Sequence, residues 1–338
     1  MTEPTVTTYS LWSLFRNCRK ACEWRYRRDL VPIERDRNLT FGALVHECLM
    51  IWHREQDLEL VLQHIDRACR DRAHDGRLRG DWHLARALMA GYATRYPKED
   101  FKVVALEKQF EGEIINPETG AASRSFVLAG KVDGIIRIGQ ENFLLEHKTT
   151  AQLGGDYLER LWTDFQISLY AWYVEKTLGI PITGILYNIL VKARLKQGQG
   201  ETETEFDTRR KELLARSKTG RSAARRKVSE SDGGFQGRLA AKYADPGMFH
   251  RETLFISRNQ FSALQTELWE LTQAFLGARR RGVFYQNTSF CFHFNRPCPY
   301  FPLCRSGGNP HLIESLYEKR PPHEELRIDP ADDGEKPF

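Results

Sequence analysis

Residues 102–150 alternate between apolar and polar side chains, and this pattern constrains the fold of the 338-residue chain more than any other feature. The stretches VVALEKQFEGEII, SFVLAGKVDGIIRI and NFLLEHKTT have the two-residue period of half-buried strands, and a GQEN turn joins the last two. We therefore predict an antiparallel meander. A helical segment, DFQISLYAWYVEKTLG, and one more strand, ITGILYNILVK, follow it.

The rest of the sequence divides into segments that differ in periodicity and composition. It contains no internal repeat and no linker rich in Pro, Gly and Ser. Before the meander the periodicity is helical: a basic amphipathic helix is predicted over 8–28, and a second helix begins near Phe41. Helical periodicity continues through LELVLQHIDRACR and WHLARALMAGYATRY, and a long helix is predicted over 257–282. The expected organisation is a helical N-terminal region (1–100), a core (101–195), a basic mobile insertion (196–247), a C-terminal helix with a cysteine segment (248–314) and a flexible tail (315–338).

Charge, hydropathy and cysteine content narrow the class of protein. There is no apolar run of the roughly 18–20 residues that a membrane-spanning helix needs, and the first residues lack a basic signal-peptide region, so we expect a cytoplasmic protein, in the host cytoplasm if a phage encodes it. The net charge of +5 is too small to name a partner. Seven cysteines without an export signal favour a metal or cluster site over a disulfide framework.

One group of polar residues in the meander carries the chemistry of a metal site. Asp133 ends one strand in GKVDG, and Glu146 and Lys148 share a face of the next in LLEHK, with His147 pointing away. Carboxylates at a sheet end suit Mg²⁺ or Mn²⁺, and a nearby lysine can assist an attacking water. These are the requirements of phosphodiester hydrolysis, although D…E-x-K alone also occurs on solvent-facing strands.

The order of motifs resembles that of the PD-(D/E)xK nuclease superfamily, and more closely its RecB-like branch with an iron–sulfur cluster, which includes AddB-type and CRISPR-associated exonucleases. FGALVH supplies the G-x3-H motif with Gly42 and His46, and DFQISLY supplies Q-x3-Y with Gln166 and Tyr170. The resemblance, from about Ser10 to Cys304, implies a restriction-endonuclease-like α/β fold with a mixed central sheet flanked by helices.

The resemblance also implies roles for individual residues. His46, Asp133 and Glu146 would hold Mg²⁺ or Mn²⁺, Lys148 would assist the water, and Gln166 and Tyr170 would border the active site. Without the resemblance, the plain interpretation is that His46 is a capped or partly buried helix histidine, Tyr170 a core residue and Gln166 a surface amide. Two further residues are weaker candidates, for acidic support and for phosphate contact: Glu107 and Lys192.

Four cysteines match the family's cluster, which joins the N- and C-terminal segments. Thiolates suit a 4Fe–4S cluster or, as the alternative, zinc with His293 as a substitute ligand. Six residues separate the second and third cysteines where the family usually has two. Cys22 is the alternative to the first of them, and Cys48 and Cys69 read as buried apolar residues. The four expected ligands are Cys18, Cys291, Cys298 and Cys304.

Two basic segments predict contacts with DNA. The N-terminal helix interleaves its cations with Trp24 and Tyr26, which suits phosphates and unpaired bases, and residues 209–227 carry nine Lys or Arg with one acid. A solvated helix face and a disordered insertion are the plainer interpretations. The expected DNA-binding residues are Arg19, Lys20, Arg25, Lys192, Arg225 and Arg226.

The leading hypothesis is a metal-dependent DNA exonuclease acting on single-stranded DNA or DNA ends in recombination, repair or phage DNA processing. The alternative is a catalytically silent iron–sulfur subunit that binds DNA in a larger repair or CRISPR adaptation complex. A redox-sensing cluster protein is a third hypothesis. The expected partners are DNA and a helicase, a recombinase or a CRISPR adaptation protein, with no membrane.

Overall fold

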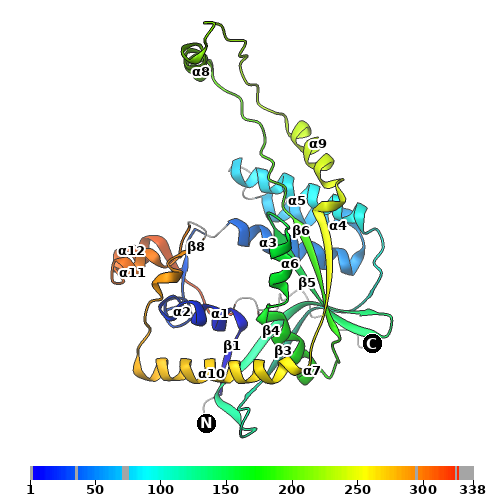
Figure 1. The fold of residues 1–338 in the computed structure, drawn as a ribbon, viewed down its shortest axis with the longest axis vertical. Helices are drawn as coiled ribbons and strands as arrows, with labels where there is room; N and C mark the ends of the chain where they lie inside the picture. The colour runs from blue at the N-terminus through cyan, green and yellow to red at the C-terminus, as the bar shows by residue number, and fades with distance from the viewer. Residues whose placement is uncertain (1–2, 35–36, 71–75, 294–295, 324–325, 327–338) are drawn as a thin grey trace.

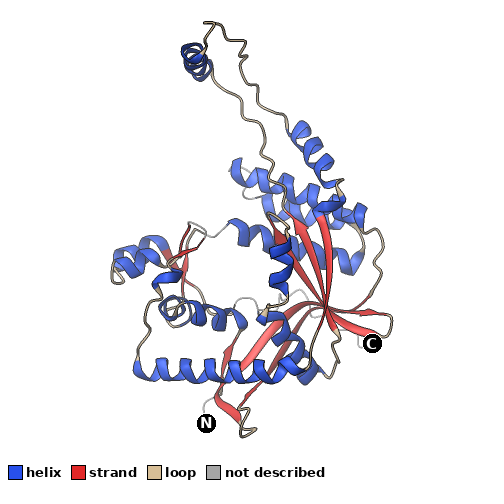
Figure 2. Cartoon of the chain, in the orientation of Figure 1, coloured by secondary structure: helices blue, strands red, loops and turns tan. Residues whose placement is uncertain are grey.

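Helices cover both faces of a six-stranded mixed sheet in the computed structural model, which describes residues 3–34, 37–70, 76–293, 296–323 and 326 (Figures 1 and 2). The sheet order is β1-β4-β5-β6-β7, and β3 pairs with the other edge of β4. The strands are β1 (Thr5–Thr7), β3 (Lys102–Ile115), β4 (Ala122–Ile138), β5 (Glu141–Thr150), β6 (Gly184–Val191) and β7 (Phe249–Phe255).

The predicted meander is confirmed, because β3, β4 and β5 are antiparallel neighbours. β6 then pairs parallel to β5, as a strand does when it returns through a crossover helix. Two strands of this sheet are not predicted from the sequence: β1 lies in the region expected to be helical, and β7 lies between the expected insertion and the long helix. Both strands lie at the ends of the sheet order. Each pairs with a strand that is distant in the sequence, so no local pattern marks the pairing.

The sheet splits along one edge of β4. β3 follows the opposite edge over its whole length, so β1 and β5 must share the remaining edge. β1 occupies that edge at Phe126–Leu128, and β5 occupies it at Gly134–Ile138. Within the described chain no strand pairs with the intervening residues 129–133 on that side, which opens the sheet beside Asp133.

One helical layer contains α1 (Tyr9–Asn17), α7 (Phe165–Leu178) and α10 (Asn259–Arg281). Trp12, Tyr173 and Phe275 from these three helices pack in one buried cluster with side chains of β4 and β6. The N-terminal helix predicted over 8–28 is broken at Cys18, which is extended (φ −159°) and separates α1 from α2 (Arg19–Tyr26). This break turns the Cys18 side chain toward the C-terminal segment.

The opposite layer contains α3 (Arg37–Glu55), α4 (Leu58–Arg70), α5 (Gly76–Arg95) and α9 (Asp232–Tyr243). Leu49, Leu88 and Phe235 from this layer are buried with Leu190 of β6. The segment 196–247, expected as one insertion, therefore has two parts. Residues 196–230 extend away from the body and carry α8 (Glu203–Arg216), whereas α9 belongs to the core (Figure 1).

The long helix α10 begins two residues after its predicted start and ends at Gly282, whose left-handed conformation (φ 67°) is typical of a helix C-terminus. It runs beneath both the sheet and the N-terminal helices and so connects the body to the C-terminal segment (Figure 1). Among the described helices, none combines the length and the apolar character needed to span a lipid bilayer.

The two ends of the chain pack together in a small module. β2 (Leu30–Pro32) pairs with β10 (Tyr317–Lys319), which lies in the segment expected as a flexible tail. Residues 327–338 of that tail lie outside the described residues. The module's other elements are η2 (Thr288–Phe290), β8 (Phe292–His293), β9 (Arg296–Pro297), α11 (Phe301–Arg305) and α12 (Pro310–Leu316).

Candidate active site and cysteine pocket

The split in the sheet brings together the carboxylates and the lysine that the sequence singled out. The last pair of the β4–β5 ladder is Gly134 with Leu145, so Asp133 and Glu146 lie directly beyond it. The Asp133 carboxylate fills part of the opening, because its Oδ2 accepts a hydrogen bond of 2.8 Å from the His147 backbone N–H. The Asp133 side chain thus accepts the hydrogen bond that a neighbouring strand would otherwise accept from the His147 N–H, and this bond holds the carboxylate in place.

Glu146 and Lys148 face the same side of β5 and are hydrogen bonded, with Lys148 Nζ 2.7 Å from Glu146 Oε1. The Glu146 side chain is 8% exposed and that of Lys148 is 26% exposed, so the carboxylate is buried while the lysine still reaches solvent. A second acid, Asp164, places Oδ2 3.8 Å from Lys148 Nζ. Sequence reasoning missed Asp164, although its position directly before the Q-x3-Y helix was a signal.

The protonation of this pair follows from burial and charge. Burial raises the pKa of Glu146 to about 7, and Asp133 adds to the rise while Lys148 opposes it. Burial disfavours the charged Lys148 ammonium, but Glu146 and Asp164 outweigh it and raise the Lys148 pKa above its ordinary value. Lys148 is therefore a fixed cation beside a carboxylate that titrates near neutrality.

His46 approaches the site from α3, as the G-x3-H pattern predicts. Its Nδ1 lies 3.2 Å from Asp133 Oδ1. Burial opposes its protonation, but Asp133, Glu146 and Glu107 together outweigh burial and raise the His46 pKa to about 9. One turn earlier, a Cβ on Gly42 would lie 3.5 Å from Thr149 Oγ1 of β5, so α3 passes close to the strand that carries Lys148.

Glu107 also lies beside the site. It is located on β3 between the residues that pair with Gly134 and Val132, which places it across from Asp133. Its backbone is left-handed (φ 49°), an unfavourable conformation for a glutamate, and its carboxylate forms an ion pair with Lys131. Glu107 therefore lies beside the candidate ligands, and its role as acidic support stays a prediction.

The two residues of the Q-x3-Y motif differ in their surroundings. Gln166 is partly exposed at the start of α7, where its backbone N–H donates to the Asp164 cap at 3.0 Å. Tyr170 is buried (5% exposed) and packs edge-on against Phe110, with ring centroids 5.1 Å apart. A Cβ at Gly130 would fall 2.5 Å from the Phe110 ring, so this contact requires a glycine there. Tyr170 thus belongs to the core beneath the site.

A buried polar network supports the site from behind. The His147 ring points away from Glu146, as predicted, and its Nδ1 lies 3.0 Å from the Asn188 amide. That amide also donates to Tyr92 Oη (3.0 Å), and Arg251 donates to both Tyr92 (3.0 Å) and Glu99 (2.6 Å). The backbone N–H that holds Asp133 is therefore anchored to β6, β7 and α5.

Arg251→Met is expected to lower the free energy of unfolding by about 3 kcal/mol, because it leaves the Glu99 carboxylate buried without its cation. The side chains of the pair are only 16% and 7% exposed. Arg258→Met is the matched control: Arg258 pairs with Glu175 but is 70% exposed, so the cost should stay within about 1 kcal/mol. Chemical denaturation measures both, and equal losses would contradict the inferred role of burial.

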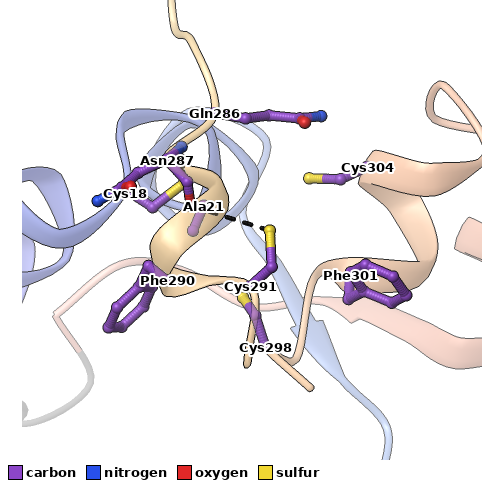
Figure 3. Close-up of a pocket in the computed structure, with 9 residues that line it drawn as sticks. All are labelled: Cys18, Ala21, Gln286, Asn287, Phe290, Cys291, Cys298, Phe301 and Cys304. Atoms are coloured by element: carbon purple, nitrogen blue, oxygen red, sulfur yellow. Dashed lines mark hydrogen bonds between the residues drawn. The ribbon is translucent and has the colours of Figure 1, made fainter. Parts of the chain in front are cut away.

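The second site is a pocket at the junction of the two chain ends (Figure 3). Cys18 comes from the break between α1 and α2, and the other three cysteines come from the C-terminal segment. The Asn287 backbone N–H donates to Cys18 Sγ at 3.4 Å, and the Cys298 N–H donates to the Cys291 carbonyl at 2.8 Å. The pocket is lined by Cys18, Ala21, Gln286, Asn287, Phe290, Cys291, Cys298, Phe301 and Cys304.

The remaining cysteines lie away from this pocket. Cys22 is fully buried in the main core, where its Sγ lies 4.0 Å from the Leu11 carbonyl. Cys48 is buried and Cys69 half-buried against the N-terminal helical layer, as expected of small apolar residues. The side chain of His293, named above as a substitute zinc ligand, lies outside the described residues.

Neither site is arranged around a single metal ion. Across the described residues, no group of three His, Cys, Asp or Glu side chains is positioned to hold one ion together. At the sheet, His46 and Glu146 are instead paired with Asp133 and Lys148. In the pocket, burial raises the pKa of the Cys298 and Cys304 thiols, and the other thiols raise it further.

The expected DNA-binding cations divide into two groups. Those on the body already have partners: Arg19 lies between the Phe15 and Tyr285 rings, and Lys20 pairs with Glu23 at 2.6 Å. Arg25 donates to the Arg320 and Pro321 carbonyls. Lys192 lies over Phe41 and 3.8 Å from Asp81. The second group, Arg225 and Arg226, is exposed in the extended segment.

The aromatic residues of the N-terminal helix are not available for stacking on bases. Trp24 is buried (4% exposed), and the cations of Lys20 and Arg28 lie over its ring. Tyr26 stacks on His323, with ring centroids 5.4 Å apart. The prediction that these aromatics face unpaired bases was wrong, because the helix packs them toward the C-terminal module and its tail.

A mixed sheet flanked by helices, split beside an aspartate and an E-x-K strand, defines the class of restriction-endonuclease-like nuclease folds. The family model of the PD-(D/E)XK nuclease superfamily matches residues 7–305. The chain therefore belongs to this superfamily, whose members generally use divalent metals such as Mg²⁺ or Mn²⁺. A search of curated proteins gave no match.

Proposed function

We propose that the protein is a metal-dependent DNA exonuclease that acts on single-stranded DNA or DNA ends, in recombination, repair or phage DNA processing. The observation that carries the proposal is the convergence of His46, Asp133, Glu146 and Lys148 at the split in the sheet. Membership in a nuclease superfamily supports it.

The chemistry of the donor set fits a hard divalent cation. Two carboxylates and an imidazole would hold Mg²⁺ or Mn²⁺, which would polarise the scissile phosphate and lower the pKa of a water. Binding requires His46 to release Asp133 and Glu146 to release one oxygen from Lys148. Lys148, kept charged by Glu146 and Asp164, would then stabilise the negative charge that develops on the phosphate.

The test is cleavage of DNA labelled separately at its 5′ and 3′ ends, with Mg²⁺ or Mn²⁺. Stepwise shortening from one end, lost in Asp133→Asn, supports an exonuclease and gives its polarity. Internal fragments of defined length would instead assign endonuclease activity. DNA binding without cleavage would favour the silent subunit. The observation on its side is that His46 pairs with Asp133 and that Glu146 pairs with Lys148.

The metal requirement should depend on pH. The raised pKa values of His46 (about 9) and Glu146 (about 7) mean that both groups bind protons at neutral pH, and a ligand must lose its proton to bind metal. The Mn²⁺ concentration for half-maximal cleavage should therefore fall as pH rises from 6 to 9, by about tenfold per unit for each proton displaced. The dependence should be shallower in His46→Asn, and a requirement independent of pH would contradict these protonation states.

We further propose that the cysteine pocket holds a 4Fe–4S cluster with a structural role, with zinc as the alternative. Four thiols of the correct softness enclose the pocket, and a cation there would relieve the mutual repulsion of their thiolates. A cluster is larger than one ion, so its four ligands need not converge on a single point. Bound there, it would tie Cys18 to the C-terminal segment.

A further inference from the structure

The segment 196–230, which we name the arm, extends beyond the rest of the molecule with α8 at its far end (Figure 1). Its two extended stretches run side by side: the Glu230 N–H donates to the Gly198 carbonyl at 2.9 Å, and the Glu201 N–H donates to the Lys227 carbonyl at 3.2 Å. No residue of α8 is buried. The arm therefore has regular structure without a hydrophobic core.

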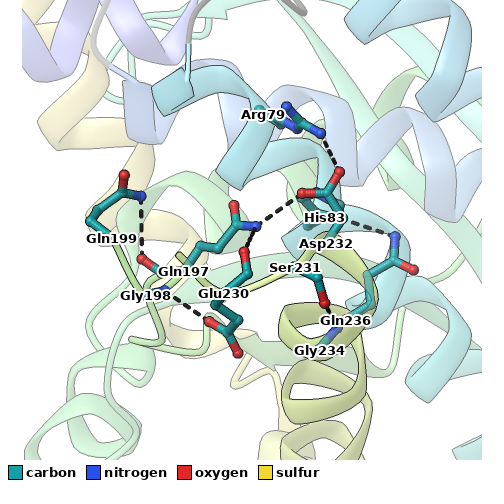
Figure 4. Close-up of polar contacts among 10 residues, drawn as sticks. All are labelled: Arg79, His83, Gln197, Gly198, Gln199, Glu230, Ser231, Asp232, Gly234 and Gln236. Atoms are coloured by element: carbon teal, nitrogen blue, oxygen red, sulfur yellow. Dashed lines mark hydrogen bonds and ion pairs between the residues drawn. The ribbon is translucent and has the colours of Figure 1, made fainter. Parts of the chain in front are cut away.

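Polar contacts fix the base of the arm to the body (Figure 4). Asp232 forms an ion pair with Arg79 of α5 and accepts a hydrogen bond of 2.9 Å from Gln197. Arg238 of α9 donates two hydrogen bonds to Glu230, at 2.7 and 2.8 Å. These bonds join both strands of the arm to helices of the core and set the direction in which it leaves.

A second set of contacts shapes the far end. Thr202 and Glu205 form a capping box at the start of α8. Arg209 donates to Glu201 at 2.8 Å and to the Arg225 carbonyl at 2.9 Å, so it closes the loop that follows the helix. The arm is thus specified at both ends.

The charge of the arm is concentrated at its far end. Residues 209–227 contain nine Lys or Arg and one acid, Glu212. Arg209 pairs with Glu201, but none of the others forms an ion pair with an acidic residue of the described chain, and all are exposed. They are Arg210, Lys211, Arg216, Lys218, Arg221, Arg225, Arg226 and Lys227. This is the reverse of the body, where the expected DNA-binding cations are engaged.

The composition of the arm identifies the kind of partner. Protein interfaces depend on buried aromatic and apolar anchors, yet no aromatic residue lies between Phe206 and Phe235. Unpaired bases are bound by aromatic stacking, and the one aromatic residue of the arm, Phe206, is half-buried with the Arg209 guanidinium over its ring. Leu213 and Val228 are exposed but isolated among the cations. A dense set of exposed cations without exposed aromatic residues matches the phosphates of a duplex, which are contacted through charge.

We propose that the arm binds the phosphate backbone of duplex DNA at a distance from the end presented to the candidate active site. This inference rests on the proposed nuclease function and specifies its substrate as an end with an adjoining duplex. From Ala193, which is buried, to the helix cap at Thr202, nine extended residues span at most about 30 Å. At 3.4 Å per phosphate along a strand, the arm reaches on the order of nine base pairs.

The test compares the wild type with Arg221→Gln/Arg225→Gln/Arg226→Gln, in which the substituted side chains have no ion pair to lose. The matched control is Arg67→Gln/Lys98→Gln/Lys102→Gln, which removes the same charge from exposed, unpaired positions on the body. The affinity of each protein is measured for two DNA substrates, which share a single-stranded end and differ in the adjoining duplex, of about 30 or about 5 base pairs. Divalent metal is left out to prevent cleavage, and the salt concentration is varied. Thermal unfolding checks that all three proteins are folded.

On the long duplex, the arm variant should bind tenfold or more weakly at 0.1 M salt, and its log–log salt slope should be smaller by about 2 to 3. On the short duplex it should match the wild type, and the control should match on both. Equal binding of the long duplex by the arm variant and the wild type would overturn the proposal and leave an acidic protein as the partner. Failure of the nuclease proposal is separate, since it appears as absence of cleavage by the wild type.

Discussion

Lys148→Met should reduce the rate of DNA cleavage by on the order of 10³-fold at saturating metal while changing DNA binding little. Lys148 Nζ lies 2.7 Å from Glu146 and 3.8 Å from Asp164, and these acids keep it charged. A cation fixed in this way stabilises charge that develops only in the transition state, so its loss affects turnover more than affinity.

The experiment needs a control for charge and for folding. Lys176→Met is suitable, because Lys176 is exposed on α7 and its ammonium contacts the Glu113 carbonyl and the Trp172 and Tyr173 rings rather than a residue of the candidate site. It should cleave DNA at the wild-type rate. In Lys148→Met, Glu146 loses the cation that opposes the rise in its pKa, so that pKa should rise further. The metal concentration is therefore increased until the cleavage rate of each variant no longer changes. A Lys148→Met protein that is folded and still cleaves at the wild-type rate would remove Lys148 from the mechanism.

Cys298→Ala should abolish the absorbance at about 400 nm that the proposed iron–sulfur cluster would give, and it should destabilise the junction of the two chain ends. Structural metal sites supply about 10 kcal/mol or more to the domains that they organise, so a loss of several kcal/mol in the free energy of unfolding is expected. The module offers little to replace it, since its buried cluster is small and comprises Cys18, Ala21, Trp24, Leu30, Tyr300, Leu303 and Tyr317.

Cys69→Ala is the matched control, because Cys69 is half-buried and lies outside the pocket. It should retain the brown colour, about four iron atoms per chain and most of the thermal stability. A colourless wild type that contains one zinc would replace the cluster with the alternative ion. A wild type without any metal, equally stable after Cys298→Ala, would remove the metal from this pocket altogether.

The candidate site was largely predictable because its residues lie on two neighbouring strands. Alternation fixed Glu146 and Lys148 on one face with His147 opposite, and the short turn after residue 138 forced Asp133 close to them. Asp164 and the network of Asn188, Arg251 and Tyr92 were not predictable in the same way. Their contacts join segments as much as 159 residues apart, and no local period records such pairings.

The tertiary structure was needed to show which cations have partners and which thiols face the pocket. The sequence showed basic segments, but not that Arg19, Lys20 and Lys192 on the body are engaged by rings or acids. It also did not show that the arm's cations other than Arg209 are exposed and form no ion pair with a described acid. It showed Cys18 and Cys22 one turn apart, but the break at Cys18 is what turns only that thiol toward the pocket.

The sequence by itself determined the strands β3, β4, β5 and β6, most of the helices and the order of the family motifs, because periodicity and turn chemistry are local. Only the tertiary structure decided where the sheet opens. β1 and β5 compete for one edge of β4, and the residues between them are left for side chains to complete. That outcome depends on pairing between distant strands, and it leaves Asp133 beside the E-x-K strand, where the proposed metal site needs a carboxylate.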